Sequence, residues 1–352
     1  MKRVLIIVPT IDSGGAEKQA VLLAVQLSKY TDVHIIILYG KHNEYELNIK
    51  LLTESTVVVH KLYGNLFSKL HQVKNIIQSS RSEIVFNYLT LPNIIGSIVG
   101  RIQGIEVYNG IRSSRLPKLK MFVERFIHNR LATGTIYNSY SGASYFRERG
   151  FKQEKNIVIP NCFNNIAPVT VREHCLIKRI ITVGRFDPSK DYETLISSIA
   201  MLKRDDFCLR IVGYGAYEDQ IRLWVNQYGI EDKTEIYIKP NNVSDLERSS
   251  DIYISSSIFE GTSNSIMEAM NWSLPVVATD VGDNNHLIIN GETGYLHSVG
   301  DAKSMSISLS RLLDSIELRN SMGIKGHQIL QKYYSMEIFE DSYIKLIKKN
   351  NK

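Results

Sequence analysis

Residues 251–270 read DIYISSSIFEGTSNSIMEAM. The apolar run at 251–257 predicts a buried strand, and the apolar residues from 266 onward recur at helical spacing. Glu260 would then lie in the loop just past the carboxyl end of a strand, and Glu268 one to two turns into a helix. Strand–loop–helix units with buried apolar strands are typical of a parallel α/β sheet.

The same unit recurs in both halves of the chain. In the first half we expect strands at 3–10, 32–38, 83–89 and 105–111 and a helix at 15–30. Residues 164–175 are polar and without a period, which predicts a linker. In the second half we expect strands at 179–186, 208–215, 235–238, 251–257 and 275–280, with helices at 192–202, through Trp224 and after Thr262.

Two α/β domains are therefore predicted, at 1–165 and 166–334. The carboxyl ends of their two sets of strands should face each other across a cleft, where open α/β sheets bind ligands.

Composition limits the classes of function. The chain has 352 residues, 43% of them hydrophobic, and a net charge of +6. Residues 1–165 hold 21 Lys and Arg against 11 Asp and Glu, whereas the remainder holds 21 against 25. This asymmetry predicts an anionic partner for the first half, either phospholipid, nucleic acid or a phosphorylated acceptor.

The sequence also predicts where the protein works. The longest apolar runs fall short of 18 residues, so we expect no membrane-spanning helix, and the apolar part of residues 1–10 is too short for a secretion signal. Cys162, Cys175 and Cys208 lack paired or zinc-like spacing, which predicts reduced thiols in a cytoplasmic protein.

Two loops carry candidate phosphate contacts. In VGRFDPSKDYETLI (183–196), Arg185 and Lys190 follow a strand and precede a helix, and two cations in that place suit a pyrophosphate. In PTIDSGGAEKQ (9–19), Gly14 and Gly15 would let the backbone approach an anion at a helix N-terminus. The alternatives are a solvated basic loop and a tight strand–helix turn.

The two glutamates flank a third candidate contact. Residues 261–265 would lie at a helix N-terminus, where free N–H groups suit phosphates. One carboxylate could then hold a sugar hydroxyl and the other a ribose, although both could be surface charges. Asp-x-Asp is absent from the sequence and the nine histidines are scattered, so we expect no tightly bound metal and no cofactor.

Taken together, these motifs are similar to those of a known family. The chain resembles the retaining glycosyltransferases of family 4, the group 1 glycosyltransferases with the GT-B fold. The matching stretches, in family order, are GGAEKQ (14–19), IPNCF (159–163), VGRFDPSKDYETLI (183–196), IVGYG (211–215), FEGTSNSIMEAM (259–270) and WSLPVVATDVGDNNHLIINGETGYL (272–296).

The resemblance implies sugar transfer from a nucleotide sugar with retention of configuration, by front-face attack without an enzyme nucleophile. Arg185 and Lys190 would bind the leaving diphosphate, Glu260 the sugar hydroxyls and Glu268 the ribose. The implied donor site comprises Gly14, Gly15, Arg185, Lys190, Gly213, Glu260, Gly261, Thr262, Ser263, Asn264, Ser265 and Glu268. By family frequency the donor would be a UDP-sugar.

The acceptor side departs from the family pattern. Many members carry a histidine where this chain reads VYNGIRSSR (107–115), so Asn109 and Arg112 are the acceptor-side candidates. We expect a glycan or lipid-diphosphate sugar acceptor, as in the synthesis of capsule, O-antigen or another surface polysaccharide. We also expect a C-terminal helix at about 335–352 to pack back on the first domain.

A basic amphipathic helix is predicted at about 115–131. Its apolar residues are Leu116, Leu119, Val123, Phe126 and Ile127, and its basic residues are Lys118, Lys120, Arg125 and Arg130. Such a helix can rest on an anionic membrane surface, which would make the protein peripheral on the inner face of the cell membrane. An ordinary core-facing helix with a solvated basic face has the same pattern.

Two other functions compete with sugar transfer. A nucleotide-sugar 2-epimerase of GT-B fold would share the donor site but would need acid and base groups in the cleft. A non-catalytic basic module would bind a membrane without chemistry. We expect the transferase, with no nucleic-acid partner. The missing histidine does not favour the epimerase, and the segment from Glu260 to Glu268 fits a transferase better. The presence of Arg185, Lys190, Glu260 and Glu268 argues against a module without chemistry.

Overall fold

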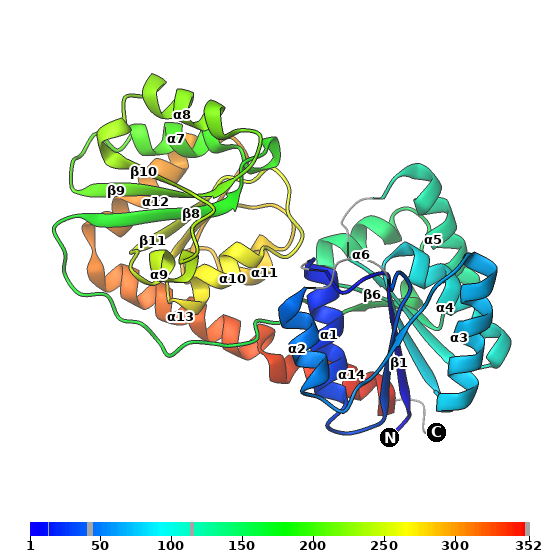
Figure 1. Cartoon of the computed structure of the whole chain (residues 1–352). Coiled ribbons are helices and arrows are strands. Elements are labelled where there is room, and N and C mark those ends of the chain that lie inside the picture. The colour runs from blue at the N-terminus through cyan, green and yellow to red at the C-terminus, as the bar shows by residue number, and fades with distance from the viewer. Residues whose placement is uncertain (13, 41–44, 113–115, 349–352) are drawn as a thin grey trace. The chain divides into compact units, whose positions relative to one another are not determined.

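The computed structural model describes residues 1–12, 14–40, 45–112 and 116–348. The predicted start of the basic helix at 115 and the last residues of the C-terminal segment, 349–352, lie outside this range. The chain forms two compact units, one of Met1–Cys162 with Met336–Lys352 and one of Phe163–Ser335. Each unit is an α/β sandwich with helices on both faces of a parallel sheet (Figure 1).

The first unit is built on a seven-stranded sheet in the order β3-β2-β1-β4-β5-β6-β7, and every strand pair is parallel. The order reverses between β1 and β4, because β1 pairs with both of them. The elements are β1 (Val4–Val8), α1 (Gly15–Leu27), β2 (Val33–Ile37), α2 (Glu46–Thr53), β3 (Val58–Lys61), α3 (Leu66–Ser80), β4 (Ile84–Tyr88), α4 (Thr90–Gln103), β5 (Glu106–Ile111), α5 (Lys118–Arg130), β6 (Gly134–Tyr137), α6 (Tyr140–Arg147), β7 (Asn156–Val158) and α14 (Met336–Lys348).

Strand β1 shows why this sheet is buried on both faces. Val4, Ile6 and Val8 belong to one apolar cluster, and Leu5 and Ile7 belong to the cluster on the other face. Successive side chains of a strand point to opposite faces, so an uninterrupted apolar run fills two cores.

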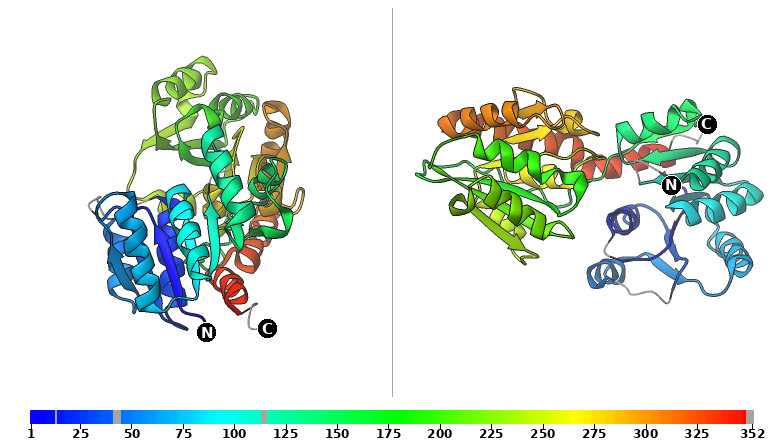
Figure 2. Two further views of the ribbon diagram at one scale, coloured as in Figure 1. Left: turned by 90° about the vertical axis from the view of Figure 1, so that its right-hand side faces the viewer. Right: turned by 90° about the horizontal axis from the view of Figure 1, so that it is seen from above.

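The C-terminal helix α14 completes one of these two cores. Its residues Phe339, Tyr343 and Ile347 join the same cluster as Val4 and the inner face of α1. Both views in Figure 2 show this helix, in red, among the elements of the first unit.

The second unit repeats the plan with a six-stranded parallel sheet in the order β10-β9-β8-β11-β12-β13. Here the order reverses between β8 and β11. The elements are β8 (Lys178–Arg185), α7 (Tyr192–Ala200), β9 (Phe207–Tyr214), α8 (Glu218–Gln227), β10 (Thr234–Ile238), α9 (Val243–Arg248), β11 (Ile252–Ser255), α10 (Asn264–Asn271), β12 (Val276–Thr279), α11 (Asn284–Leu287), β13 (Gly294–His297), α12 (Ala302–Asp314) and α13 (Ile316–Tyr334).

The predicted strands and helices are confirmed, with their ends shifted by a few residues. The strand expected at 251–257 is Ile252–Ser255, and the helix expected at 15–30 is Gly15–Leu27. Every residue of the predicted linker 164–175 is described, and none of them belongs to a helix or strand. Among the described helices, none combines the length and hydropathy that crossing a membrane requires.

Candidate active site

A cavity of about 450 Å³ lies at the carboxyl ends of β8 and β11 in the second unit. This is where the strand order of the sheet reverses, which is the usual ligand site of an open α/β sheet. Its lining is Val183, Gly184, Arg185, Asp187, Ser189, Lys190, Phe259, Glu260, Thr262, Ser263, Asn264, Ser265 and Glu268. Most of the residues that the sequence proposed for a donor site are thus brought together.

The end of β11 holds the loop after β8 in place. The Ser256 hydroxyl donates to the carbonyl oxygens of Lys190 (2.8 Å) and Asp191 (2.7 Å). The Ile258 N–H donates to the carbonyl oxygen of Ser189 at 2.8 Å. These bonds tie the short 3-10 turn Pro188–Lys190 to the loop that carries Glu260.

Lys190 and Glu260 form an ion pair across the cavity wall. The Lys190 ammonium lies 2.5 Å from Glu260 Oε1, and the Ser257 hydroxyl donates to the same oxygen at 2.8 Å. Arg185, the last residue of β8, is exposed. Its side chain forms no hydrogen bond or ion pair with another described residue. The two cations are therefore not equivalent, because one is engaged by a carboxylate and the other is free to meet an anion.

The helix α10 presents its N-terminus to this cavity. Ser263 is its N-cap residue, yet the Ser263 side chain makes no capping hydrogen bond, so the first-turn N–H groups remain available to an anionic ligand. Glu268 lies one turn into the helix and also lines the cavity. Behind it, burial and the charge of Glu268 raise the pKa of Glu247 to about 8.

The backbone of the Glu260 loop is fixed by the chain that follows β12. The Asp283 N–H donates to the Gly261 carbonyl oxygen at 3.0 Å. Gly282 has φ +59°, and a Cβ there would lie 2.5 Å from the carbonyl oxygen of Glu260. Glycine at position 282 is thus required for this close approach, which sets the position of the Glu260 side chain.

Comparison with known proteins agrees with this geometry. Residues 177–329 match the family model of the glycosyl transferases group 1. We call these residues, 177–329, the group 1 domain after the family model that they match. The cavity, with Arg185, Lys190, Glu260 and Glu268, lies entirely within this domain.

The whole chain is also similar to known glycosyltransferases. It is 24% identical to the N-acetylgalactosamine-N,N'-diacetylbacillosaminyl-diphospho-undecaprenol 4-alpha-N-acetylgalactosaminyltransferase of Campylobacter jejuni, over 97% of this chain and 98% of the relative. It matches the structure of a glycosyltransferase from Rickettsia africae with a TM-score of 0.83 and 17% identity, over 100% of this chain and 99% of the other. It matches the Anabaena HepE protein in complex with UDP with a TM-score of 0.80 and 16% identity, over 99% and 100%. The GT-B fold expected from the sequence is confirmed.

Gly213 is not among the residues that line the group 1 domain's cavity, and its contact with a donor stays a prediction. It pairs with Gly184 in the β8–β9 register, and a Cβ at 213 would lie 1.9 Å from the Gly184 carbonyl oxygen. Gly261 is also absent from the lining and contributes a backbone acceptor instead. Gly14 and Gly15 belong to the other unit, at the start of α1, and their contact with a donor stays a prediction.

The side chain of Asn109 is enclosed within the first unit, and its acceptor-side role stays a prediction. Asn109 is 1% exposed, and its side chain bonds with those of Asn87 (2.9 Å) and Ser97 (3.0 and 3.1 Å). These bonds join β4, β5 and α4 inside the first unit. Arg112, in contrast, lines a separate cavity of that unit.

Three residues that shape the group 1 domain's cavity were not predicted as site residues. Ser257 bonds Glu260, Ser189 lies in the turn beside Lys190, and Phe259 forms part of the wall. Their positions in the sequence could have indicated a role, because each of the three lies within three residues of Glu260 or Lys190 on the same loop.

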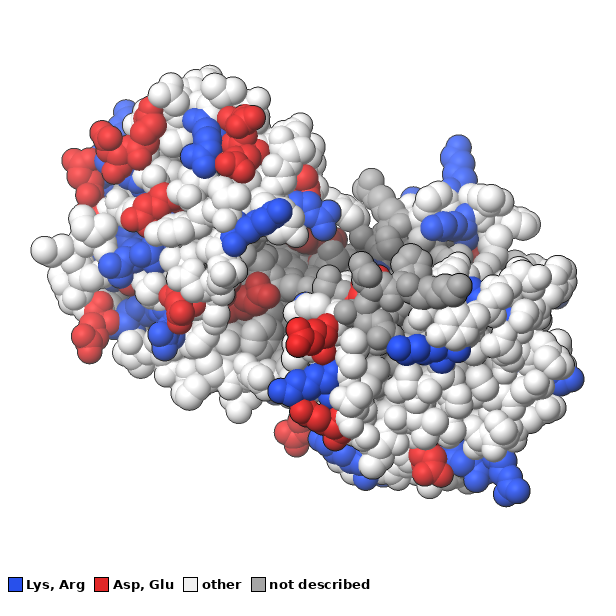
Figure 3. Space-filling model, viewed as in Figure 1, with Lys and Arg blue, Asp and Glu red and all other residues white. Residues whose placement is uncertain are grey.

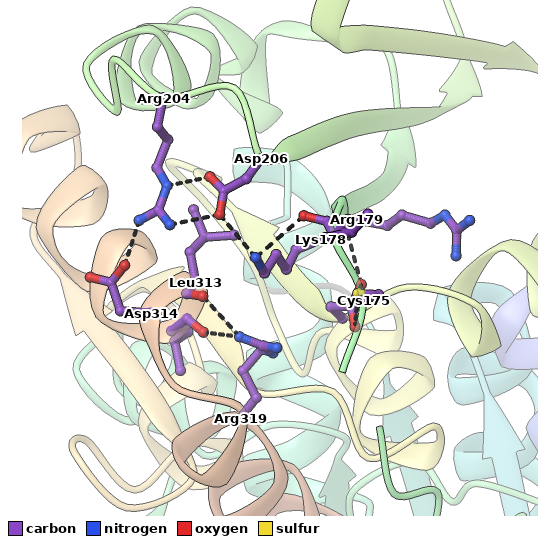
Figure 4. A network of polar contacts seen from close by, with 11 residues as sticks. Cys175, Lys178, Arg179, Arg204, Asp206, Leu313, Asp314 and Arg319 are labelled. Carbon is purple, nitrogen blue, oxygen red and sulfur yellow. Dashed lines mark hydrogen bonds and ion pairs between the residues drawn. The ribbon is translucent and has the colours of Figure 1, made fainter. Parts of the chain in front are cut away.

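A second charged cluster of the group 1 domain is structural. Arg204 donates to both Asp206 oxygens (2.5 and 2.8 Å) and to Asp314 (2.7 Å), and Lys178 donates to Asp206 at 2.9 Å (Figure 4). Hydrogen bonds from Arg204 and Lys178 hold the pKa of Asp206 well below its usual range. The cluster ties the start of β8 to α12 and lies at the strand ends opposite the cavity. Among the described residues, no group of three or more His, Cys, Asp or Glu side chains could hold a metal ion.

The predicted basic helix is confirmed as α5, but two of the three residues that it buries are polar. Its buried residues are Glu124, Ile127 and His128. Leu119, Phe122 and Phe126 are 77%, 61% and 55% exposed. Of the predicted apolar stripe, Ile127 is buried and Leu116 packs against an apolar cluster, whereas Leu119 and Phe126 face the solvent. On the face shown in Figure 3, basic and acidic side chains are interspersed over both units.

Proposed function

We propose that the protein is a retaining glycosyltransferase that moves a sugar from a nucleoside diphosphate sugar to a lipid-linked glycan. The observation that carries the proposal is the cavity of the group 1 domain. It gathers two cations, three carboxylates (Asp187, Glu260 and Glu268) and the N-terminus of α10 around a space of about 450 Å³. UDP is the nucleotide we propose, supported by the UDP complex of the structurally similar HepE protein.

The chemistry of this cavity follows from the charge that develops during transfer. As the bond between the anomeric carbon and the diphosphate breaks, negative charge grows on the leaving group. Arg185, Lys190 and the free N–H groups of α10 would stabilise that charge without reorganising. The two cations would thereby do the work that a divalent metal does in other transferases.

Glu260 is suited to binding rather than attack. The Lys190 ammonium and the Ser257 hydroxyl both bond its Oε1, which lowers the nucleophilicity of that oxygen. We propose that Glu260 accepts hydrogen bonds from sugar hydroxyls and that Glu268, one turn into α10, binds the ribose. The acceptor hydroxyl would then attack from the face that the diphosphate leaves, through an oxocarbenium-like state.

Incubation with a panel of nucleotide sugars tests this function. Thermal shift identifies the nucleotide sugars that bind, and transfer then releases the free nucleoside diphosphate only when an acceptor is present. Proton NMR of the product reads the anomeric configuration. An inverted product would overturn retention, an isomerised nucleotide sugar would indicate the epimerase, and neither binding nor turnover would leave a non-catalytic module.

We propose that the acceptor end of the reaction takes place at an anionic membrane surface. The Campylobacter relative is named for an acceptor on diphospho-undecaprenol, and α5 exposes Leu119, Phe122 and Phe126 beside the basic residues Lys118 and Lys120. An exposed apolar stripe flanked by cations suits insertion among anionic lipid headgroups. Each basic residue near the surface contributes about 1 kcal/mol to such binding.

Sedimentation with phosphatidylglycerol vesicles tests the membrane surface. Replacing Leu119, Phe122 and Phe126 with Ser should release most of the bound protein, at low and at high salt. Replacing Lys118 and Lys120 with Gln should weaken binding at low salt only, because salt screens charges. Leu223→Ser, which removes an exposed leucine of α8, is the matched control. Unchanged sedimentation of the triple variant would contradict the proposal.

A further inference from the structure

The first unit has its own cavity, of about 420 Å³, at the carboxyl ends of β1, β4 and β5. It lies where the strand order of that sheet reverses, so it is the counterpart of the cavity in the group 1 domain. Much of its wall is apolar, and three charged residues line it. The described residues that line it are Pro9, Leu89, Thr90, Leu91, Pro92, Gly110, Ile111, Arg112, Leu116, Pro117, Lys120 and Glu124.

Arg112 is the partly buried cation of this cavity. Its Nη2 donates to the Tyr343 hydroxyl at 2.9 Å, and its guanidinium lies 4.7 Å from the centre of the Tyr88 ring. Its Nε and Nη1 are buried, and neither has a hydrogen-bond partner within the part of the chain that the structure describes. A buried, charged donor pair without partners is costly, which points to a ligand that accepts from it.

Glu124 is the buried carboxyl of the same cavity. It is 2% exposed, and the Asn93 amide donates to both of its oxygens, at 3.0 and 3.1 Å. Burial raises its pKa to about 7, against hydrogen bonds from Asn93 and Thr90 and the charge of Lys120. Burial, with a smaller contribution from the charge of Glu124, raises the pKa of Tyr137 on β6. Lys120, at the exposed edge, adds a second cation.

We propose that this cavity binds the phosphorylated end of the acceptor, with Arg112 and Lys120 on the phosphate oxygens and Glu124 on a hydroxyl of the attached sugar. The proposal rests on the function proposed above and adds the class of group that the acceptor carries. A planar guanidinium with two free N–H groups matches two phosphate oxygens. The volume suits one phosphorylated sugar, and the apolar wall suits the start of a lipid chain.

The protonation of Glu124 then affects binding. A neutral carboxyl can donate to a hydroxyl and does not repel a phosphate. An ionised carboxylate cannot donate, and its charge repels the phosphate. The groups that face it are Thr90 and Asn93 from α4, Lys120 from its own helix, Tyr137 from β6, and Arg112 across the cavity. Phosphate affinity should therefore fall as the pH rises through about 7.

Calorimetric titration of the full chain, saturated with UDP so that the donor site is occupied, tests the proposal. The probes are inorganic pyrophosphate, N-acetylglucosamine 1-phosphate and a short-chain isoprenyl diphosphate. All three should bind the wild type, and the isoprenyl compound should bind most tightly if the phosphate comes from a lipid. Arg112→Met should weaken pyrophosphate binding at least tenfold, and Lys120→Met about threefold. Because Lys120 is exposed, its variant should fold even if the Arg112 variant does not.

Two further measurements distinguish a failure of this inference from a failure of the proposed function. Glu124→Gln should abolish the fall in pyrophosphate affinity between pH 6 and pH 8. The affinity of the variant is divided by that of the wild type at each pH, because this ratio removes the effect of the probe's own titration. UDP binding should be unchanged in all three variants. If UDP binds but the probes do not, or if Lys120→Met and Arg112→Met bind pyrophosphate like the wild type, this inference is overturned while the donor site stands. If UDP itself does not bind, the proposed function is overturned.

Discussion

Replacing Lys190 with Met should affect activity and stability differently from replacing Arg185 with Met. In the proposed function both residues supply positive charge to the leaving diphosphate, and loss of one such stabiliser costs about 10²–10³-fold in rate. Within the described ranges, however, only Lys190 of the two pairs with a carboxylate, at 2.5 Å from Glu260. Arg185→Met should therefore lose activity at unchanged stability, whereas Lys190→Met should lose both.

The stability cost follows from the contacts of Glu260. Without Lys190, the carboxylate keeps only the Ser257 hydroxyl as a recorded partner at 2.8 Å. A largely buried charge that loses a charged hydrogen-bond partner costs about 1–3 kcal/mol. For a unit of this size that is roughly 2–12 °C in Tm. The double variant Lys190→Met with Glu260→Gln removes the unpaired charge and should recover most of the stability but none of the activity.

Differential scanning fluorimetry and a nucleoside-diphosphate release assay measure the two quantities on the same four proteins. The unfolding transition of the group 1 domain is identified as the one that we expect UDP to shift. The reasoning fails if Arg185→Met lowers Tm as much as Lys190→Met does. It also fails if the double variant stays as unstable as Lys190→Met, because the loss would then not come from the unpaired carboxylate.

Further predictions address the pH dependence, the metal, the strand pairing and the two glutamates. The raised pKa of Glu124, from 4.5 to about 7, means that its contribution to stability is present below pH 4.5 and lost as the pH rises toward 7. Glu124→Gln should then match the wild type at pH 5 and exceed its unfolding free energy by on the order of 3 kcal/mol at pH 8 in urea denaturation, and equal stabilities at pH 8 would contradict this. Transfer should survive EDTA, and a loss that Mg²⁺ restores would show that a metal serves the diphosphate. Gly213→Ala should destabilise the group 1 domain by roughly 2 kcal/mol or more, because its Cβ meets a strand carbonyl oxygen, and a smaller loss in Tm-based measurements would show that the strands can separate. In calorimetry Glu268→Gln should weaken UDP binding while Glu260→Gln leaves it nearly intact, and the reverse would exchange the two assigned roles.

Much of the donor site was predictable because it is local in sequence. Glu260, residues 262–265 and Glu268 lie on one strand–loop–helix unit, so their spacing fixes their mutual geometry. Arg185 and Lys190 lie on another such unit, and parallel strands bring their carboxyl ends to the same edge of the sheet. The alternation of apolar strands and helices was sufficient for the α/β class.

Other assignments depended on which side chains meet in three dimensions. The pairing of Lys190 with Glu260 joins positions 70 residues apart, and the need for glycine at 213 comes from its neighbour on β8. Asn109 and Arg112 were predicted from the same stretch of sequence. In the structure Asn109 lies in a buried amide network, whereas Arg112 lines a cavity. Strand pairing decided this, because sequence gives the alternation of side chains along a strand but not the partners on its neighbours.

Helix α5 shows the same limit for a whole face. Its helical period was evident, and a helix with that pattern would ordinarily turn its apolar stripe to the core. In the folded unit the polar residues Glu124 and His128 are buried, because Asn93 and Thr135 offer them hydrogen-bond partners. The apolar residues Leu119 and Phe122 are left outside. Sequence determined that this segment is an amphipathic helix, and only the tertiary structure decided which face meets the solvent, since burial of a polar side chain depends on partners that the rest of the fold supplies.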